Sequence, residues 1–508
     1  MKPTRVALLA AAGMFLTSMS VYSLTPPGGF AHAGPGPYGA DPVPTTELVP
    51  GKTTAVPLPA ELSRFTDGKT LTVEGRVGNP KLARSSNGET FVMLEVRPAD
   101  GVAAGNAAPV NLSLVIDRSG SMKGTRIRNA IAGAVGAVER LNDGDVVSVV
   151  TFDTQTQVVV PTTVIGPGAR ERINGAIRGI GLGGDTCISC GLEEGMRLLA
   201  QTTGKVNRII LLSDGDANHG VRDVPGFRGI AQRAQGRGVS VTTIGVDVEY
   251  NEKIMAAIAQ DSNGRHYFVA DDSGLARVFE EEALSLTRAV ASNAEVAVNL
   301  APGVELDRVF DRSFRRAANQ IIVPLGTFAG SDVKTVLLKV RVPHDREGTV
   351  PVAGVVLAYR DLLSGNDSRC GGELGLEVVP GATPAGELDP LVSGRVQRSE
   401  TAAVLKDANG LFERGQLDEA RRRLATREVA LKGAAVQAQN AAPPARAREI
   451  DRDFQSQLAA VDGANNAFGP SPTFASPPGA PPAPAPQATR AGKSAVRENQ
   501  KRALDMGF

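Results

Sequence analysis

The stretch that decides the fold of this chain is residues 110–122, VNLSLVIDRSGSM. Residues 110–116 form a β-type run of largely apolar side chains, which ends in Asp117 and a turn of glycine and serine. Residues 124–141 follow at once with apolar side chains at helical spacing. A strand that leads directly into a helix is the first unit of an alternating α/β pattern.

The same alternation continues for the next 150 residues or so. We predict strands at residues 110–116, 146–152, 207–213, 239–245 and 266–269, and helices at residues 124–141, 187–200, 221–235, 252–260 and 273–287. Strands that alternate with helices predict a doubly wound, mostly parallel sheet with helices on both faces. Such sheets bind ligands at the carboxyl ends of their strands.

Three of these strand ends or loops carry oxygen-bearing side chains. Asp117, Ser119 and Ser121 follow the first strand, Thr186 follows the glycine-rich segment 179–185, and Asp214 follows the strand at 207–213. Hard divalent cations favour a set made only of oxygens. Because the set has few carboxylates, a cation there should keep waters, so we expect Mg²⁺, or Mn²⁺, rather than Ca²⁺.

These five residues, in this order, closely resemble the metal-ion-dependent adhesion site of von Willebrand factor type A domains. The resemblance covers roughly residues 110–286 and extends to residues 211–218 and 243–245. It implies a type A domain at residues 109–290 that binds proteins and performs no chemical step. It further implies that Ser119 and Ser121 coordinate the metal directly, that Thr186 joins them when ligand is bound, and that Asp117 and Asp214 act directly or through water.

The partner implied by this resemblance is a protein that offers an Asp or Glu carboxylate to an open position on the metal. The physical chemistry agrees, because neutral hydroxyls in place of acidic ligands leave the cation under-neutralised. The whole chain also resembles bacterial exported type A domain proteins that carry a β-domain, some of them labelled as relatives of calcium-activated chloride channels. We do not carry the channel label over, since no run of about 18 apolar residues occurs outside the N-terminus.

The flanks of the α/β segment have different patterns. Residues 61–108 hold two short β-type runs, at 71–77 and 90–96, and residues 291–380 read as an all-β, sandwich-like domain. The early hairpin could complete the later sheet, which would make the α/β domain an insertion in a β-domain. A helical segment follows at 387–465, with a helical hairpin that turns at Gly415 and Gln416, then a Pro/Ala linker at 466–488 and a basic, amphipathic tail at 489–508.

The first 33 residues have the pattern of an export signal. Lys2 and Arg5 precede an uncharged stretch, and a small-x-small triplet ends at Ala33. We expect cleavage after Ala33 and a flexible linker at 34–60, with an uncleaved membrane anchor as the alternative. The protein is therefore expected to be exported, either periplasmic, extracellular or membrane-tethered, with a membrane partner only if the segment stays uncleaved.

The three cysteines leave three interpretations open. Cys187 and Cys190 form a CxxC at the predicted start of a helix, directly after Thr186, and Cys370 is left over. The pair could form a local disulfide that stiffens the loop, pack as two small unpaired residues, or act as a thioredoxin-like redox pair. The resembling family does not require these cysteines, so the sequence departs from its pattern here.

Composition and motifs argue against two classes of function, nucleic-acid binding and serine hydrolysis. The 508 residues carry 55 basic and 54 acidic side chains, for a formal net charge of +1, which argues against a nucleic-acid binder. A hydrolase built on Ser119 or Ser121 is disfavoured, because no GxSxG or SxxK motif surrounds them and no histidine is paired with them. A structural envelope component with a structural metal remains the main alternative to a metal-dependent binding protein.

Overall fold

The computed structural model describes residues 62–102, 109–270, 274–381, 386–468 and 485–507. All of them belong to one compact unit, residues 58–508. The expected signal at residues 1–33 and the expected linker at 34–60 lie outside the described residues. Among the described residues, no helix has the length and apolar character needed to cross a membrane.

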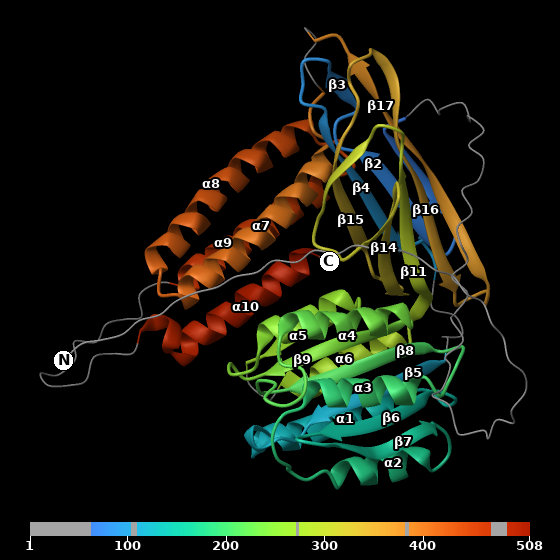
Figure 1. The fold of residues 1–508 in the computed structure, drawn as a ribbon, viewed down its shortest axis with the longest axis vertical. Coiled ribbons are helices and arrows are strands. Elements are labelled where there is room, and N and C mark those ends of the chain that lie inside the picture. The colour runs from blue at the N-terminus through green and yellow to red at the C-terminus, as the bar shows by residue number, and fades with distance from the viewer. Residues whose placement is uncertain (1–61, 103–108, 271–273, 382–385, 469–484, 508) are drawn as a thin grey trace, which may run out of the picture. The chain divides into compact units, whose positions relative to one another are not determined.

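The α/β segment folds into a six-stranded, mostly parallel sheet in the order β10-β9-β8-β5-β6-β7 (Figure 1). Its strands are β5 (Val110–Asp117), β6 (Val146–Phe152), β7 (Thr156–Val164), β8 (Val206–Ser213), β9 (Val239–Val246) and β10 (His266–Val269). All neighbours are parallel except β7, which runs antiparallel to β6. The predicted fold class is therefore confirmed. The sequence analysis missed β7, an edge strand that contains Pro161.

Helices cover both faces of this sheet. They are α1 (Thr125–Arg140), α2 (Ala169–Arg178), α3 (Ile188–Leu199), α4 (Val224–Gly236), α5 (Glu252–Asp261) and α6 (Leu275–Leu286). Side chains of α1, α2 and α6 share one apolar core with Leu112 and Leu114 of β5, whereas α3, α4 and α5 share a second core with Val115. Successive side chains of β5 point to opposite faces of the sheet, so this one strand contributes to both apolar cores. Every residue of β5 is buried, which makes it the centre of the sheet.

The remaining strands form two sheets that pack face to face. The first sheet has the order β1-β2-β4-β15-β12, and the second has the order β13-β14-β11-β16-β17-β3. The bounds are β1 (Arg64–Gly68), β2 (Leu71–Val77), β3 (Lys81–Ala83), β4 (Glu89–Pro98), β11 (Ala289–Leu300), β12 (Glu305–Val309), β13 (Arg315–Ala317), β14 (Gln320–Ala329), β15 (Lys334–Arg341), β16 (Gly348–Asp361) and β17 (Asp367–Val379). Both sheets contribute to a single apolar core, as in a β-sandwich.

The strands that precede the α/β segment pair with strands that follow it. Residues 89–96 of β4 lie antiparallel to residues 334–341 of β15, with Leu94 opposite Val336. At the other sheet's edge, β3 pairs in parallel with β17. The α/β segment is therefore inserted between two parts of one β-sandwich.

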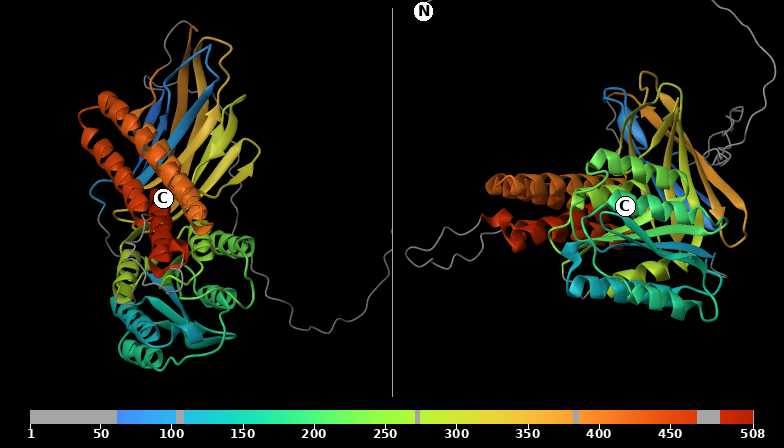
Figure 2. Two further views of the ribbon diagram at one scale, coloured as in Figure 1. Left: turned by 90° about the vertical axis from the view of Figure 1, so that its left-hand side faces the viewer. Right: turned by 60° about the horizontal axis from the view of Figure 1, so that its bottom comes forward.

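Four α-helices follow the β-sandwich in the described residues 386–468 and 485–507. They are α7 (Pro390–Glu413), α8 (Leu417–Ala441), α9 (Ala447–Ala467) and α10 (Arg490–Gly507). Helix α10 packs beside α7 and α9 (Figures 1 and 2), and its Ala495, Val496 and Ala503 enter their common apolar core. The C-terminal segment read from sequence as a basic, amphipathic tail is thus a helix whose apolar side is buried.

His266, at the start of β10, is a buried and uncharged histidine. Its Nδ1 lies 2.8 Å from the Thr243 hydroxyl, which itself donates to the Met255 carbonyl, and its Nε2 lies 3.0 Å from the Tyr250 hydroxyl. Because that threonine proton is committed elsewhere, Nδ1 donates and Nε2 accepts. Burial lowers the pKa of His266 to about 3, with smaller contributions from the positive charges of Arg497 and Lys501.

We expect the α/β segment to lose stability between pH 7 and pH 5 because of His266. The lowered pKa means that the unfolded chain takes up a proton below about pH 6.5 that the folded chain refuses, so stability falls as the pH falls. The loss should be about 2 kcal/mol at pH 5. Thermal unfolding at several pH values would measure it in the wild type and in His266→Gln. An equally steep dependence on pH in the variant would contradict this assignment.

Candidate metal site

Asp117 ends β5 and is fixed by two neighbouring loops. Its Oδ1 accepts a hydrogen bond from the Ser119 backbone N–H at 2.8 Å, and its Oδ2 accepts one from the Ser213 hydroxyl at 2.6 Å. Burial raises the pKa of Asp117 to about 6, although the hydrogen bonds from Ser119 and Ser213 oppose the shift. The carboxylate therefore ties the end of β5 to the end of β8.

The two serines place their hydroxyls side by side, next to the second aspartate. Ser119 Oγ and Ser121 Oγ lie 3.0 Å apart, and Ser121 Oγ donates to Asp214 Oδ1 at 2.7 Å. Ser119 is buried, whereas Ser121 is exposed. Asp214, which follows β8, is buried as well. Parallel strands bring these residues together because their carboxyl ends meet at one edge of the sheet.

Thr186 reaches the same point from the loop before α3. Its backbone N–H donates to Asn218 Oδ1 at 2.8 Å, which links this loop to the one after β8. A methyl group placed on Gly215 would lie 3.5 Å from Ser121 Oγ and 3.6 Å from Thr186 Oγ1. Both hydroxyl oxygens therefore lie within 3.6 Å of one position, which the missing side chain of Gly215 leaves free.

The glycine-rich segment before Thr186 packs directly on the loop after β5. Gly183 donates its backbone N–H to the Arg118 carbonyl at 2.7 Å, and Gly120 donates to the Gly184 carbonyl at 3.1 Å. A methyl group on Gly183 would lie only 1.8 Å from Asp153 Oδ2. The Asp153 side chain therefore occupies the space that a side chain at position 183 would need.

The side chains at this edge fit a hard divalent cation. Asp117, Ser119, Ser121, Thr186 and Asp214 are all held at or beside one point, and they offer only carboxylate and hydroxyl oxygens. Within the described ranges, no group of three or more His, Cys, Asp and Glu side chains is arranged to hold a metal. Binding at this edge would thus rely on neutral hydroxyls as much as on charge.

A protein cation already contacts this site. Arg126 of α1 donates from Nη1 to Asp214 Oδ2 at 2.7 Å and to the Ser121 carbonyl at 3.0 Å. Its Nη2 pairs with Asp247 Oδ2, which lies in the loop after β9. The sequence analysis did not select Arg126 or Asp247, because they lie far apart in sequence and no motif links them.

The ion pairs extend from Asp247 to the C-terminal helix. Arg490, the first residue of α10, places Nη1 2.7 Å from Asp247 Oδ1. Asp247 therefore holds one guanidinium on each carboxylate oxygen. A continuous series of polar contacts joins α10 to the hydroxyl of Ser121, through Arg490, Asp247, Arg126 and Asp214.

Cys187 and Cys190 form a disulfide directly after Thr186. Cys187 is fully buried and precedes the first residue of α3. The neighbouring Ser189 hydroxyl accepts a hydrogen bond from the Val221 N–H at 3.0 Å, which ties the same turn to the loop after β8. Cys370 is a half-buried free thiol, and burial raises its pKa to about 11. Of the three interpretations of the CxxC pair, the structure has the local disulfide.

Replacing both cysteines with serine is expected to lower the free energy of unfolding by about 2 kcal/mol, because the small closed loop restricts the unfolded chain. The disulfide also fixes the residue after Thr186, so metal affinity should fall by a few-fold. Denaturant unfolding and metal titration of the double variant would measure both effects. An unchanged unfolding midpoint would show that the disulfide adds nothing to stability.

Residues 111–281 match the family model of the von Willebrand factor type A domain. This segment is a von Willebrand factor type A domain. Among the curated proteins that are similar to this chain, two are described as uncharacterised. An uncharacterised protein of Synechocystis sp. is 27% identical over 281 residues, 53% of this chain and 66% of its own length. The uncharacterised protein YfbK of Escherichia coli is 28% identical over 196 residues, 38% of this chain and 34% of its own length.

A solved structure shares the fold beyond the type A domain. The von Willebrand factor type A protein from Catenulispora acidiphila superposes with a TM-score of 0.64 at 17% identity, over 79% of this chain and 92% of that one. At this identity the likeness concerns the fold alone. This protein therefore carries a type A domain together with an additional β-domain and C-terminal helices.

Proposed function

We propose that this protein binds a protein partner through a divalent cation held at the strand edge of its type A domain. The hydroxyls of Ser119, Ser121 and Thr186 would hold the cation directly, and Asp117 and Asp214 would act through their carboxylates or through water. The observation that carries the proposal is that Ser121 Oγ and Thr186 Oγ1 lie within 3.6 Å of one position beside Gly215, and that Ser121 Oγ also contacts the Asp214 carboxylate.

The donor set favours an acidic partner. Neutral hydroxyls leave a bound divalent cation with uncompensated positive charge, so it attracts an external carboxylate. Asp117 is held by Ser119 and Ser213, whereas Asp214 contacts the exposed Ser121 and the partly exposed Arg126, which puts Asp214 nearer to the solvent side of the site. We therefore propose an Asp or Glu side chain of the partner as the last ligand, and Mg²⁺ as the cation, with Mn²⁺ or Ca²⁺ as substitutes.

We further propose that the protein works outside the cytoplasm, in the periplasm, in the medium or tethered to a membrane. The disulfide between Cys187 and Cys190 supports this proposal, because disulfides persist in oxidising compartments. The β-sandwich and the C-terminal helices would present the type A domain to its partner. Binding of this kind needs no catalytic step.

Capture from envelope and extracellular extracts on the immobilised chain would test the proposal. A partner should be retained in Mg²⁺ buffer by the wild type and released by a chelator. The same partner should be absent from a parallel column of the Asp214→Ala variant. Retention that ignores both the chelator and the substitution would refute a metal-bridged function and direct attention to the β-sandwich or the helices.

A further inference from the structure

Helix α10 contacts the type A domain mainly through charges. Its Arg490, Lys493 and Arg497, which follow one another at about one-turn intervals, pair with three acidic residues around the start of α5. The pairs are Arg490 with Asp247 at 2.7 Å, Lys493 with Glu249 at 2.8 Å and Arg497 with Glu252 at 2.5 Å. The opposite, apolar side of α10 is buried against α7 and α9.

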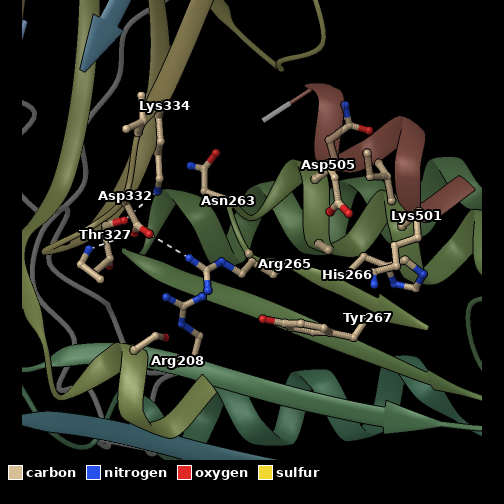
Figure 3. Close-up of a pocket in the computed structure, with 18 residues that line it drawn as sticks. Arg208, Asn263, Arg265, His266, Tyr267, Thr327, Asp332, Lys334, Lys501 and Asp505 are labelled. Carbon is tan, nitrogen blue, oxygen red and sulfur yellow. Dashed lines mark hydrogen bonds and ion pairs between the residues drawn. The ribbon is translucent and has the colours of Figure 1, made fainter. Parts of the chain in front are cut away.

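The far end of α10 leaves a cavity instead of a packed contact. Lys501, Leu504 and Asp505 line a space of about 440 Å³ together with residues of α5, β10 and the β14–β15 turn (Figure 3). Charged side chains surround it, and Arg265 pairs across it with Asp332 at 2.8 Å. The first half of α10 thus holds the type A domain through the three ion pairs, together with a hydrogen bond from Arg490 to the Ala270 carbonyl and the contact of Arg497 with the Tyr250 ring.

One of these three pairs leads into the candidate metal site. Arg490 and Arg126 both pair with the Asp247 carboxylate, and the Nη1 atom of Arg126 pairs with Asp214. The Asp247 side chain is only 9% exposed, so its pair with Arg126 is weakly screened, whereas solvent screens the pair with Arg490, whose side chain is 65% exposed. Lys493, by contrast, pairs with Glu249, whereas the acids that Arg126 contacts among the described residues are Asp214 and Asp247, so Lys493 offers a matched comparison on the same helix.

We propose that α10 is a latch that lowers the cation affinity of the type A site while it is docked. The inference rests on the proposed function and adds its regulation. With Arg490 docked, Asp247 has one oxygen for Arg126, and Arg126 keeps Asp214 as its second partner. When Arg490 leaves, Asp247 Oδ1 keeps the hydrogen bond from the Val248 N–H but loses its guanidinium. Its remaining lone pair can then accept from Arg126, which holds Asp247 with both nitrogens and releases Asp214 to a cation.

The coupling between cation binding and the docking of α10 must be reciprocal. If docked α10 weakens cation binding by some factor, then bound cation weakens the docking of α10 by the same factor. Filling the metal site would thus loosen the contact between the type A domain and the C-terminal helices. An acidic partner and the release of α10 would then favour each other.

Titration of the full chain with Mn²⁺ alone, by calorimetry, tests this coupling. We expect Arg490→Gln to bind Mn²⁺ about fivefold more tightly than the wild type, the lower end of typical coupling between sites. The control is Lys493→Gln, which removes the same charge from the same helix and should stay within about twofold of the wild type. Equal affinity of Arg490→Gln and the wild type would overturn the latch while leaving the metal site in place.

A double variant shows whether the effect passes through Arg126. In an Arg126→Gln background, Arg490→Gln should change the Mn²⁺ affinity by less than about twofold, because the residue that carries the coupling is gone. An undiminished fivefold gain in that background would show that the coupling does not pass through Arg126 and that Arg490 acts on the metal site by long-range electrostatics alone. If no variant binds Mn²⁺ at all, the proposed function fails and the latch with it.

Hydrogen exchange gives a readout that does not depend on affinity. Saturating Mn²⁺ should raise the exchange of backbone amides across residues 493–500 of α10 in the wild type, since docking weakens. Asp214→Ala should show no such response at the same Mn²⁺ concentration. Unchanged exchange in a wild-type chain that binds Mn²⁺ would overturn the latch.

Discussion

Replacing Asp214 with alanine is expected to lower the affinity for Mg²⁺ or Mn²⁺ about 100-fold, equivalent to about 2.8 kcal/mol, and to abolish partner retention. The substitution removes the carboxylate that lies beside the Ser121 hydroxyl and the open side of the site. It also leaves Arg126 with Asp247 as its acidic partner, so the charge beside the site becomes more positive. Metal titration by calorimetry would measure the loss.

The matched control for this variant is Asp216→Ala. Asp216 is an exposed carboxylate two residues further along the same loop, so its removal changes the net charge equally. The control should keep its metal affinity within about twofold, because an exposed charge is screened by solvent. Both variants should give the circular dichroism and unfolding transition of a folded type A domain. Equal affinity of Asp214→Ala and the wild type would refute the site assignment.

Replacing Arg126 with glutamine is expected to raise the metal affinity about tenfold. The Arg126 side chain pairs with Asp214 at 2.7 Å and is only 28% exposed, so its charge competes with any cation for that carboxylate. Two unit charges about 4 Å apart interact by about 4 kcal/mol at an effective dielectric of about 20. This interaction energy is larger than the free-energy change that corresponds to a tenfold gain in affinity, so removal of the Arg126 charge can account for the gain. Glutamine retains a hydrogen-bond donor for Asp214.

Arg128→Gln is the control for this second prediction. Arg128 lies on the same helix and carries the same charge, but it is exposed. Its replacement should leave the metal affinity within about twofold. A tenfold gain in Arg126→Gln together with no gain in Arg128→Gln would identify Arg126 as the competing cation. A loss of affinity in Arg126→Gln would show instead that the arginine positions Asp214 for the metal.

The sequence determined the α/β architecture because its pattern is local. The segment at β5 carries its own strand pattern, its turn and the helix that follows, and all three can be read without knowledge of distant residues. The candidate site residues follow from the same pattern. Each of them sits at a strand end or at the start of a helix, and parallel strands bring such positions to one edge.

The β-sandwich could be predicted only in part. The runs that became β2 and β4 were visible, but their partners lie beyond the inserted domain, and β4 finds β15 more than 200 residues later. Two strands that pair over such a distance are not linked by any recognisable sequence pattern, because burial in a shared core sets their register. The short, exposed strands β12 and β13 gave no clear alternation either.

By itself, then, the sequence determined the parallel strands of the sheet, most of its flanking helices and the oxygen-bearing residues at its edge. Only the tertiary structure placed Arg126, Asp247 and Arg490 in line with Asp214. The physical reason is that a hydrophobic pattern records which face of an element is buried, whereas an ion pair between three separate elements depends on how those elements pack. Charged side chains look alike in sequence until packing decides which of them share one carboxylate.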